Sequence, residues 1–96
     1  MKKFFVLFSI FCSCSNNDVA FYLQEAHKSY EVFDYPNAIY YYSKAIEEEP
    51  DNNNAYVMRG LSKFKSGDKN GACTDWSQAG QLGSQEAYTL IQENCQ

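Results

Sequence analysis

Few side chains in this chain could carry out covalent or metal chemistry: it has four cysteines and one histidine among 96 residues. Structural zinc sites bring Cys or His ligands together in short paired spacings. Here a single residue separates Cys12 from Cys14, Cys73 and Cys95 lie 22 positions apart, and His27 stands alone. This spacing does not match a zinc site, so we expect no metal and no cofactor.

Arrangements typical of enzymes are also missing from the sequence pattern. No Gly-rich phosphate loop follows a strand pattern, no carboxylate pair marks a pocket, and no Ser-His-Asp set can be assembled around His27. Cys12 and Cys14 could cycle between thiols and a disulfide, but a predicted cleavage site separates them. We therefore expect that the protein is not an enzyme.

The N-terminus has the pattern of an export signal. Met1, Lys2 and Lys3 form a basic tip, and the apolar run from Phe4 to Phe11 follows. That run is too short to cross the roughly 30 Å hydrocarbon core of a bilayer as a permanent helix. The pattern predicts a secretory signal peptide.

The residues after this apolar run suggest a lipid attachment site. Cys14 follows the small residue Ser13, whereas Cys12 follows the bulky Phe11. The segment resembles the lipobox of bacterial lipoproteins. This resemblance implies a lipoprotein signal peptide over 1–13, diacylglycerol on Cys14 and a lipidated tether over 14–18. It also implies export to the bacterial cell envelope, on the periplasmic or outer-membrane face. Phe11 stands where Leu is usual, so cleavage to a soluble product is the alternative.

The charge of the predicted mature chain argues against one class of partner. Without Lys2 and Lys3, six basic and twelve acidic residues remain, a formal charge of −6. Nucleic acid binding needs clustered Lys and Arg. We therefore expect no nucleic acid partner. We interpret the acidic run over 47–49 as a solvated helix end, and the alternative is that it binds a cation or a basic partner.

An internal repeat determines the predicted fold. Displaced by 34 positions, the chain matches itself at Tyr22/Tyr56, Ala26/Gly60, Asp34/Asp68, Ala38/Ala72, Tyr42/Trp76 and Ala45/Ala79. Helix axes approach to about 8 to 10 Å only where small side chains face each other. The alanines and the glycine suit such contacts, and the aromatic rings suit the spaces beside them. A fixed period of this length predicts stacked helical hairpins.

These residues resemble the tetratricopeptide repeat, whose signature combines an aromatic, a small residue, a Gly-Asp turn, and an Ala, aromatic and Ala series. The departures are Phe33 in place of the turn Gly, Ser84 in place of a closing Pro, and Glu25 and Arg59 in place of Leu. The resemblance implies an all-α fold, a fragment of an α-solenoid. Its parts are a first repeat over 19–50, a second over 53–83 and a C-terminal capping helix over 84–96.

The spacing of the last two cysteines predicts a disulfide. Cys73 precedes Gly83 by ten residues and Cys95 follows it by twelve, so an antiparallel hairpin turning at Gly83 brings them together. Disulfides persist in exported proteins, and one closing this loop would contribute about 3 kcal/mol. Two buried free thiols are the alternative.

The tetratricopeptide resemblance also implies a partner-binding surface. In that family the concave face is lined by the first helix of each repeat. The corresponding residues here are Leu23, His27, Tyr30, Glu31, Val57, Leu61, Phe64 and Lys65. Leu23, Val57 and Leu61 replace the polar side chains that some members use to bind a terminal carboxylate, so that ligand is not expected.

This mostly apolar stripe indicates a contact surface for an apolar helix or extended peptide, oriented by His27, Glu31 and Lys65. The alternative is that the apolar side chains pack among themselves as core. The predicted function is a membrane-anchored protein–protein interaction module of the cell envelope. The alternative function is a structural subunit of an envelope complex, with no separate ligand groove.

Overall fold

The computed structural model describes residues 18–96, and no β-strand occurs within that range. A helix covers residues 18–31, which we call the leading helix. It is followed by α2 (Tyr35–Glu48), α3 (Asn53–Lys65), α4 (Lys69–Gln81) and α5 (Gln85–Asn94). The predicted all-α fold is confirmed. Residue 18, assigned above to the tether, is already helical.

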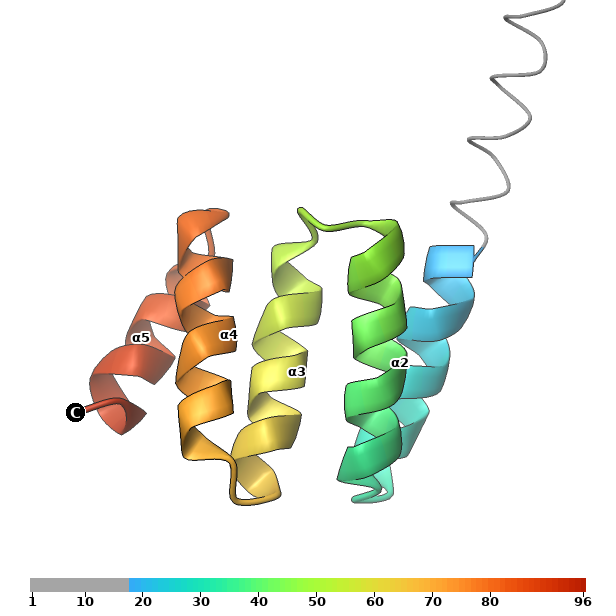
Figure 1. Cartoon of the computed structure of the whole chain (residues 1–96), viewed down its shortest axis with the longest axis horizontal. Helices are drawn as coiled ribbons and strands as arrows, with labels where there is room; N and C mark the ends of the chain where they lie inside the picture. Colours follow the sequence, from blue (N-terminus) through green and yellow to red (C-terminus); the bar gives the residue numbers. More distant parts are fainter. Residues whose placement is uncertain (1–17) are drawn as a thin grey trace, which may run out of the picture.

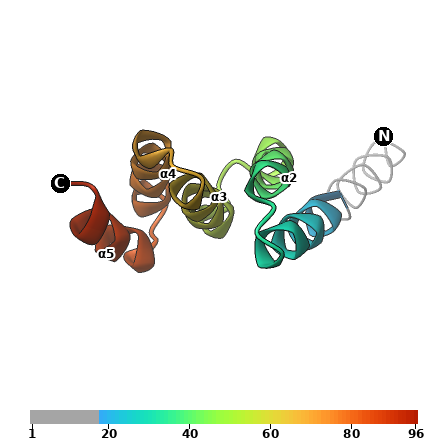
Figure 2. The same cartoon turned by 90° about the horizontal axis from the view of Figure 1, so that it is seen from below.

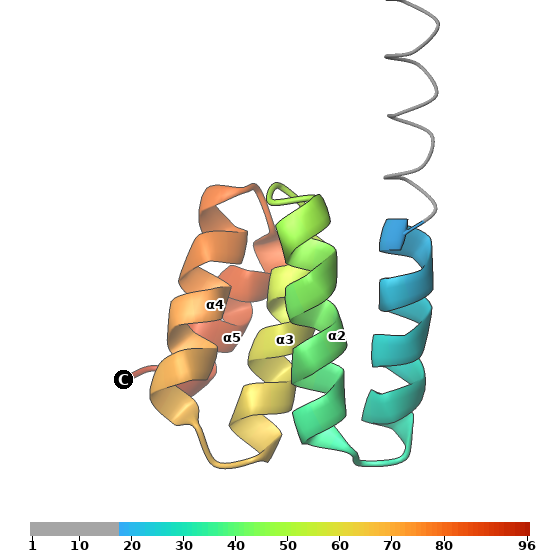
Figure 3. The ribbon, with the colours of Figure 1, turned by 45° about the vertical axis from the view of Figure 1, so that its right-hand side comes forward.

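The helices stand side by side in chain order, joined at alternate ends by short turns (Figure 1). The leading helix and α2 form a first hairpin, α3 and α4 form a second, and α5 packs against α4. From below, α2 and α4 lie in one row and the other three helices lie in the opposite row (Figure 2). A further view shows the two hairpins stacked next to each other (Figure 3). The two rows of helices therefore form two opposite faces of the molecule.

Short polar side chains begin each of the four labelled helices. Asp34, Asn52, Asp68 and Ser84 accept a hydrogen bond from the backbone N–H three residues later. Such N-caps satisfy backbone donors that have no partner inside the helix. Pro36 lies in the first turn of α2, where its missing N–H is not needed.

Three of the four turns contain one residue in the left-handed backbone conformation. Phe33, Gly67 and Gly83 have positive φ angles of 64°, 97° and 103°. After each of them, the cap residue's N–H donates to a carbonyl five residues earlier, as from Asp68 to Lys63 at 2.8 Å. Glycine adopts this left-handed backbone without steric cost, which explains Gly67 and Gly83. Phe33 is the exception.

Two clusters of buried side chains form the core. The first core cluster contains Ala26, Ala38, Tyr42, Ile46 and Ala55. The second core cluster contains Val57, Ala72, Trp76, Ala79 and Ala87. Alanines recur at the helix contacts and one large aromatic ring fills the space in each cluster, as the repeat predicted. Tyr22 and Tyr56, also predicted to fill such spaces, are only half-buried.

Trp76 is the largest fully buried side chain among the described residues. Its indole Nε1–H donates to the carbonyl oxygen of Val57 at 3.2 Å, which satisfies its one polar group. The ring lies directly over Gly60: a Cβ added there would come within 2.5 Å of Nε1. Gly60 therefore sets how closely α3 approaches α4.

Candidate functional site

The candidate partner surface lies on the row that contains the leading helix and α3 (Figure 2). In the leading helix, Leu23 and Tyr30 are half-buried and pack against the first core cluster. His27 and Glu31 are exposed and lie one helical turn apart, with Nε2 of the histidine 3.2 Å from Oε2 of the glutamate. The two polar positions are therefore accessible, and the two apolar positions are only partly so.

The residues of α3 that were predicted to bind a partner differ more in exposure than those of the leading helix do. Val57 is only 2% exposed and belongs to the second core cluster, so its assignment to the partner surface requires correction. The reason is that Val57 packs in this cluster with Trp76 of α4 and Ala87 of α5. Leu61 is half-buried against that cluster.

The end of α3 is the most accessible part of that helix within the candidate surface. Phe64 is 37% exposed, and its ring lies with its centroid 5.7 Å from that of Trp76. Lys65 next to it is exposed. No pocket is found over residues 18–96. The available surface is therefore a shallow strip made of Leu23, His27, Tyr30, Glu31, Leu61, Phe64 and Lys65, which we call the inner strip.

Within the described part of the chain, no group of three or more His, Cys, Asp or Glu side chains could hold a metal ion. His27 has an exposed carboxylate as its partner. The inner strip can bury apolar surface and form peripheral ion pairs, which is the chemistry of a protein contact.

A charged network that the sequence analysis missed joins three helices. Arg59 donates from Nε and Nη2 to both carboxylate oxygens of the buried Asp75, at 2.9 and 2.8 Å. Its Nη1 donates to Ser43 Oγ on α2 at 3.0 Å, and Lys63 Nζ lies 3.1 Å from Asp75. The hydrogen bond to Asp75 raises the pKa of Arg59 above its usual value. The network thus holds α2 and α4 to α3.

One sequence signal could have pointed to this network. Arg59 stands where the tetratricopeptide pattern commonly has Leu, and Asp75 precedes the buried Trp76 in an otherwise uncharged stretch of helix. A long cationic side chain at a position that normally faces the core needs an anionic partner. The sequence did not identify which carboxylate would supply it.

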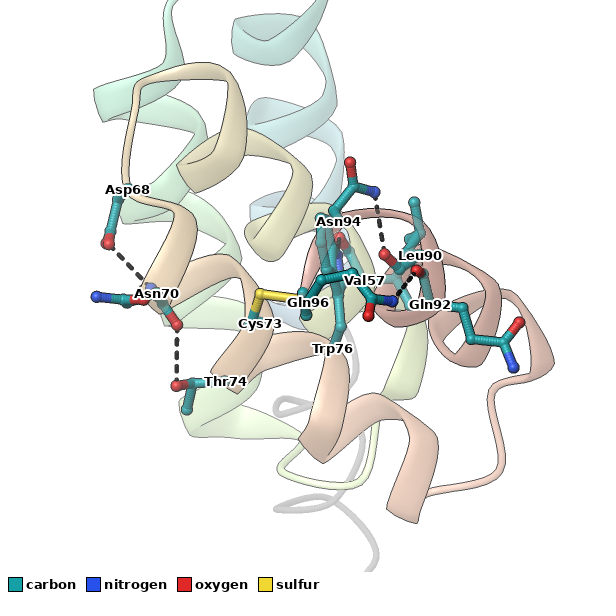
Figure 4. The surroundings of a disulfide bond; sticks show 12 residues. Val57, Asp68, Asn70, Cys73, Thr74, Trp76, Leu90, Gln92, Asn94 and Gln96 are labelled. Carbon is teal, nitrogen blue, oxygen red and sulfur yellow. Dashed lines mark hydrogen bonds between the residues drawn. A yellow bond between two sulfur atoms is a disulfide. The ribbon is translucent and has the colours of Figure 1, made fainter.

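The predicted disulfide is confirmed. Cys73 on α4 is bonded to Cys95, the residue after α5, and their Cα atoms lie 5.9 Å apart. Figure 4 shows the bond beside Trp76 and the C-terminal residues Leu90, Asn94 and Gln96. The alternative of two free thiols is therefore wrong. The bond attaches the end of α5 over the second core cluster.

The predicted signal peptide, the predicted lipid site Cys14 and most of the predicted tether lie outside the described residues. Over residues 18–96, each helix is too short or too polar to span a lipid bilayer. No model of a known protein family matches the chain. No curated protein is significantly similar to it either.

Proposed function

We propose that this protein is a tetratricopeptide-type interaction module that binds a protein segment along the inner strip. The observation that carries the proposal is the partial exposure of the apolar side chains Tyr30, Leu61 and Phe64 on one face of a helical stack. Beside them lie the exposed His27–Glu31 pair and Lys65. Apolar surface next to fixed charges suits a segment that binds by burial and is oriented by ion pairs.

Two features of the hairpins support the tetratricopeptide assignment. Ala26, Ala38, Ala45, Ala72 and Ala79 are all completely buried, as the signature alanines of that repeat would be. Tyr42 and Trp76 occupy equivalent buried positions 34 residues apart. The same packing therefore occurs twice with the period of the repeat.

The expected ligand is an amphipathic helix or an extended apolar segment of another envelope protein. Since the inner strip is shallow, affinity would depend on aromatic contacts with Phe64 and Tyr30 rather than on a deep pocket. The exposed charges at the two ends differ in sign, because Glu31 lies on the leading helix and Lys65 on α3. A bound segment would be oriented by this difference.

The lipid on Cys14 is part of the proposal. Diacylglycerol together with a further acyl chain would hold the module on a membrane, because each buried methylene contributes about 0.8 kcal/mol. Mass spectrometry of the mature protein tests this point. The expected product begins at Cys14 and carries the lipid, and an unmodified chain that begins elsewhere contradicts it.

Site-specific photocrosslinking in intact cells tests the partner surface. A benzophenone amino acid replaces Phe64 or His27 on the inner strip, and Tyr40 on α2 serves as an exposed aromatic control from the opposite row. We expect crosslinks to a protein from positions 64 and 27 and none from position 40. Equal crosslinking from all three positions, or none from the inner strip, contradicts the proposal.

A second function has one observation in its favour. Leu23, Tyr30 and Leu61 contact the core clusters, and no pocket is found over residues 18–96. A passive subunit of an envelope complex needs only a flat contact of this kind. One stoichiometric crosslinked partner would favour the subunit, whereas several substoichiometric partners would favour the interaction module.

A further inference from the structure

The leading helix carries a stripe of three exposed residues and the half-buried Glu25 on the side away from the first core cluster. The stripe consists of Phe21, Glu25, Lys28 and Val32, spaced by four, three and four residues. Phe21 and Val32 are 54% and 70% exposed, which is high for large apolar side chains. Between them, Lys28 Nζ lies 3.2 Å from Glu25 Oε2. We call these four residues the outer stripe.

The repeat shows what covers this face when another helix precedes it. Thirty-four positions later, Ala55 and Ser62 of α3 correspond to Phe21 and Lys28, and both are completely buried. Ala55 belongs to the first core cluster, together with Tyr42 and Ile46 of α2. The part of this face around Ala55 and Ser62 is therefore a packing face in the second hairpin, whereas Ser66, which corresponds to Val32, is exposed. In the first hairpin, nothing within residues 18–96 covers this face.

The outer stripe is complementary to itself. A twofold axis perpendicular to the leading helix, placed between Ala26 and His27, relates position 21 to position 32 and position 25 to position 28. Two antiparallel copies of the helix would thus place each Phe21 against Val32 of the other copy. The same operation would place each Glu25 against Lys28 of the other copy. Because residues spaced by three and four positions lie on one side of a helix, all four side chains of each copy would face the other helix.

We propose that two copies of this chain associate through antiparallel pairing of their leading helices along the outer stripe. A twofold interface requires a surface that is its own complement, and this stripe has that property for both its apolar and its charged residues. The bulky side chains fit helix axes near the upper end of the usual 8 to 10 Å range. With lipid on both copies of Cys14, the twofold axis would lie along the membrane normal, since both N-termini must reach one bilayer.

Exchanging the charges of Glu25 and Lys28 tests this pairing, because the twofold axis creates two Glu25–Lys28 contacts between the copies. The mature full chain is studied in density-matched detergent by sedimentation equilibrium, up to about 1 mM because a single helix pair is a small interface. Glu25→Lys and Lys28→Glu each place like charges together and should weaken association at least about tenfold. The double exchange restores opposite charges and should restore association.

Lys44→Glu is the matched control. Lys44 and Glu47 form an exposed ion pair with the same three-residue spacing on α2, outside the outer stripe. This variant should associate like the unaltered chain, whereas Val32→Ser, which removes an exposed apolar contact, should weaken association. Circular dichroism verifies that each variant remains helical. A monomer at all concentrations, failure of the double exchange to restore association, or equal loss with Lys44→Glu overturns the proposal.

Discussion

The two hairpins fill the space between their helices with different pairs of one aromatic and one small residue. In the first, Tyr42 packs in one cluster with the completely buried Ala26. In the second, the larger Trp76 lies over Gly60, which has no side chain. A larger ring is thus matched by a smaller residue on the facing helix. The comparison shows that hairpin spacing depends on the pair and not on either residue alone.

The hairpins differ more in how they are held together. The second hairpin has the Arg59–Asp75 ion pair between its helices and the disulfide that attaches Cys95 to α4. The corresponding positions of the ion pair in the first hairpin are Glu25 and Tyr41, and Glu25 pairs with Lys28 of its own helix. The first hairpin therefore depends on apolar packing, whereas the second adds an ion pair between its own helices and a covalent bond from α4 to the end of α5.

Removing Asp75 should have the largest effect. Asp75→Ala leaves Arg59 and Lys63 without their carboxylate in a mostly buried setting, which should lower the free energy of unfolding by about 3 kcal/mol. Urea unfolding followed by circular dichroism measures the loss. Thr74→Ala, at the exposed neighbouring position, is the control and should change little.

A second variant separates the value of the pair from the penalty of an unpaired charge. Replacing Arg59 and Asp75 together with leucine leaves neither of these two charges buried alone and should recover part of the stability. A loss below about 1 kcal/mol for Asp75→Ala would show that the network contributes no more than a surface ion pair does.

Alkaline pH should lower the stability of the first hairpin through Tyr42. Burial raises the pKa of Tyr42 from 10.0 to about 12, and the nearby Tyr30 acts in the same direction. The folded state thus retains a proton that the unfolded state releases, so stability is fully present below pH 10 and is lost as pH rises from 10 to 12. The loss from this group is at most about 2 to 3 kcal/mol. The matching residue of the second hairpin, Trp76, has no such proton.

Urea unfolding at a series of alkaline pH values measures this dependence. Tyr42→Phe removes the ionisable group and keeps the ring, so its stability should decline less steeply between pH 10 and 12. The same slope in both proteins would show that other groups cause the alkaline loss.

Gly60→Ala tests whether the size of the Trp76 ring is matched to the size of the residue at position 60. The added methyl would meet the indole of Trp76 and the carbonyl oxygen of Ala72, which should reduce stability by about 2 kcal/mol. Combining it with Trp76→Tyr recreates the Ala–Tyr pair of the first hairpin. The double variant should lose at least about 1 kcal/mol less than the sum of the two single losses. Simple additivity would contradict the comparison.

The smallest effect is expected at the turns. Phe33 and Gly67 are equivalent turn residues with positive φ, and only the glycine is free of steric strain there. Phe33→Gly should raise the free energy of unfolding by about 0.5 to 1 kcal/mol, and Gly67→Ala should lower it by about 1 kcal/mol. Changes of the same sign at the two turns would show that the exposed Phe33 ring contributes more than its backbone strain costs.

Much of this fold could be predicted from local patterns. The repeat of 34 residues predicted the helical hairpins, and the short polar residues Asp68 and Ser84 and the turn residue Gly67 lie at helix ends. The cysteine spacing about Gly83 predicted the disulfide. These predictions succeeded because helix ends, turns and the small and aromatic positions of a hairpin depend on residues close together in the chain.

The candidate site was less predictable. The repeat pattern placed Val57 beside Leu61 and Phe64 on one helical face, but α5 and the second core cluster bury Val57. Arg59 and Asp75 lie 16 positions apart, and no periodic rule connects them.

The sequence alone determined the helical hairpins, their register and the cysteine pair. Only the tertiary structure decided which faces of those hairpins remain accessible: Phe64, Phe21 and Val32 are exposed, whereas Val57 and Asp75 are buried. The physical reason is that periodicity specifies the faces of a helix, whereas burial depends on which other helices come to lie against them.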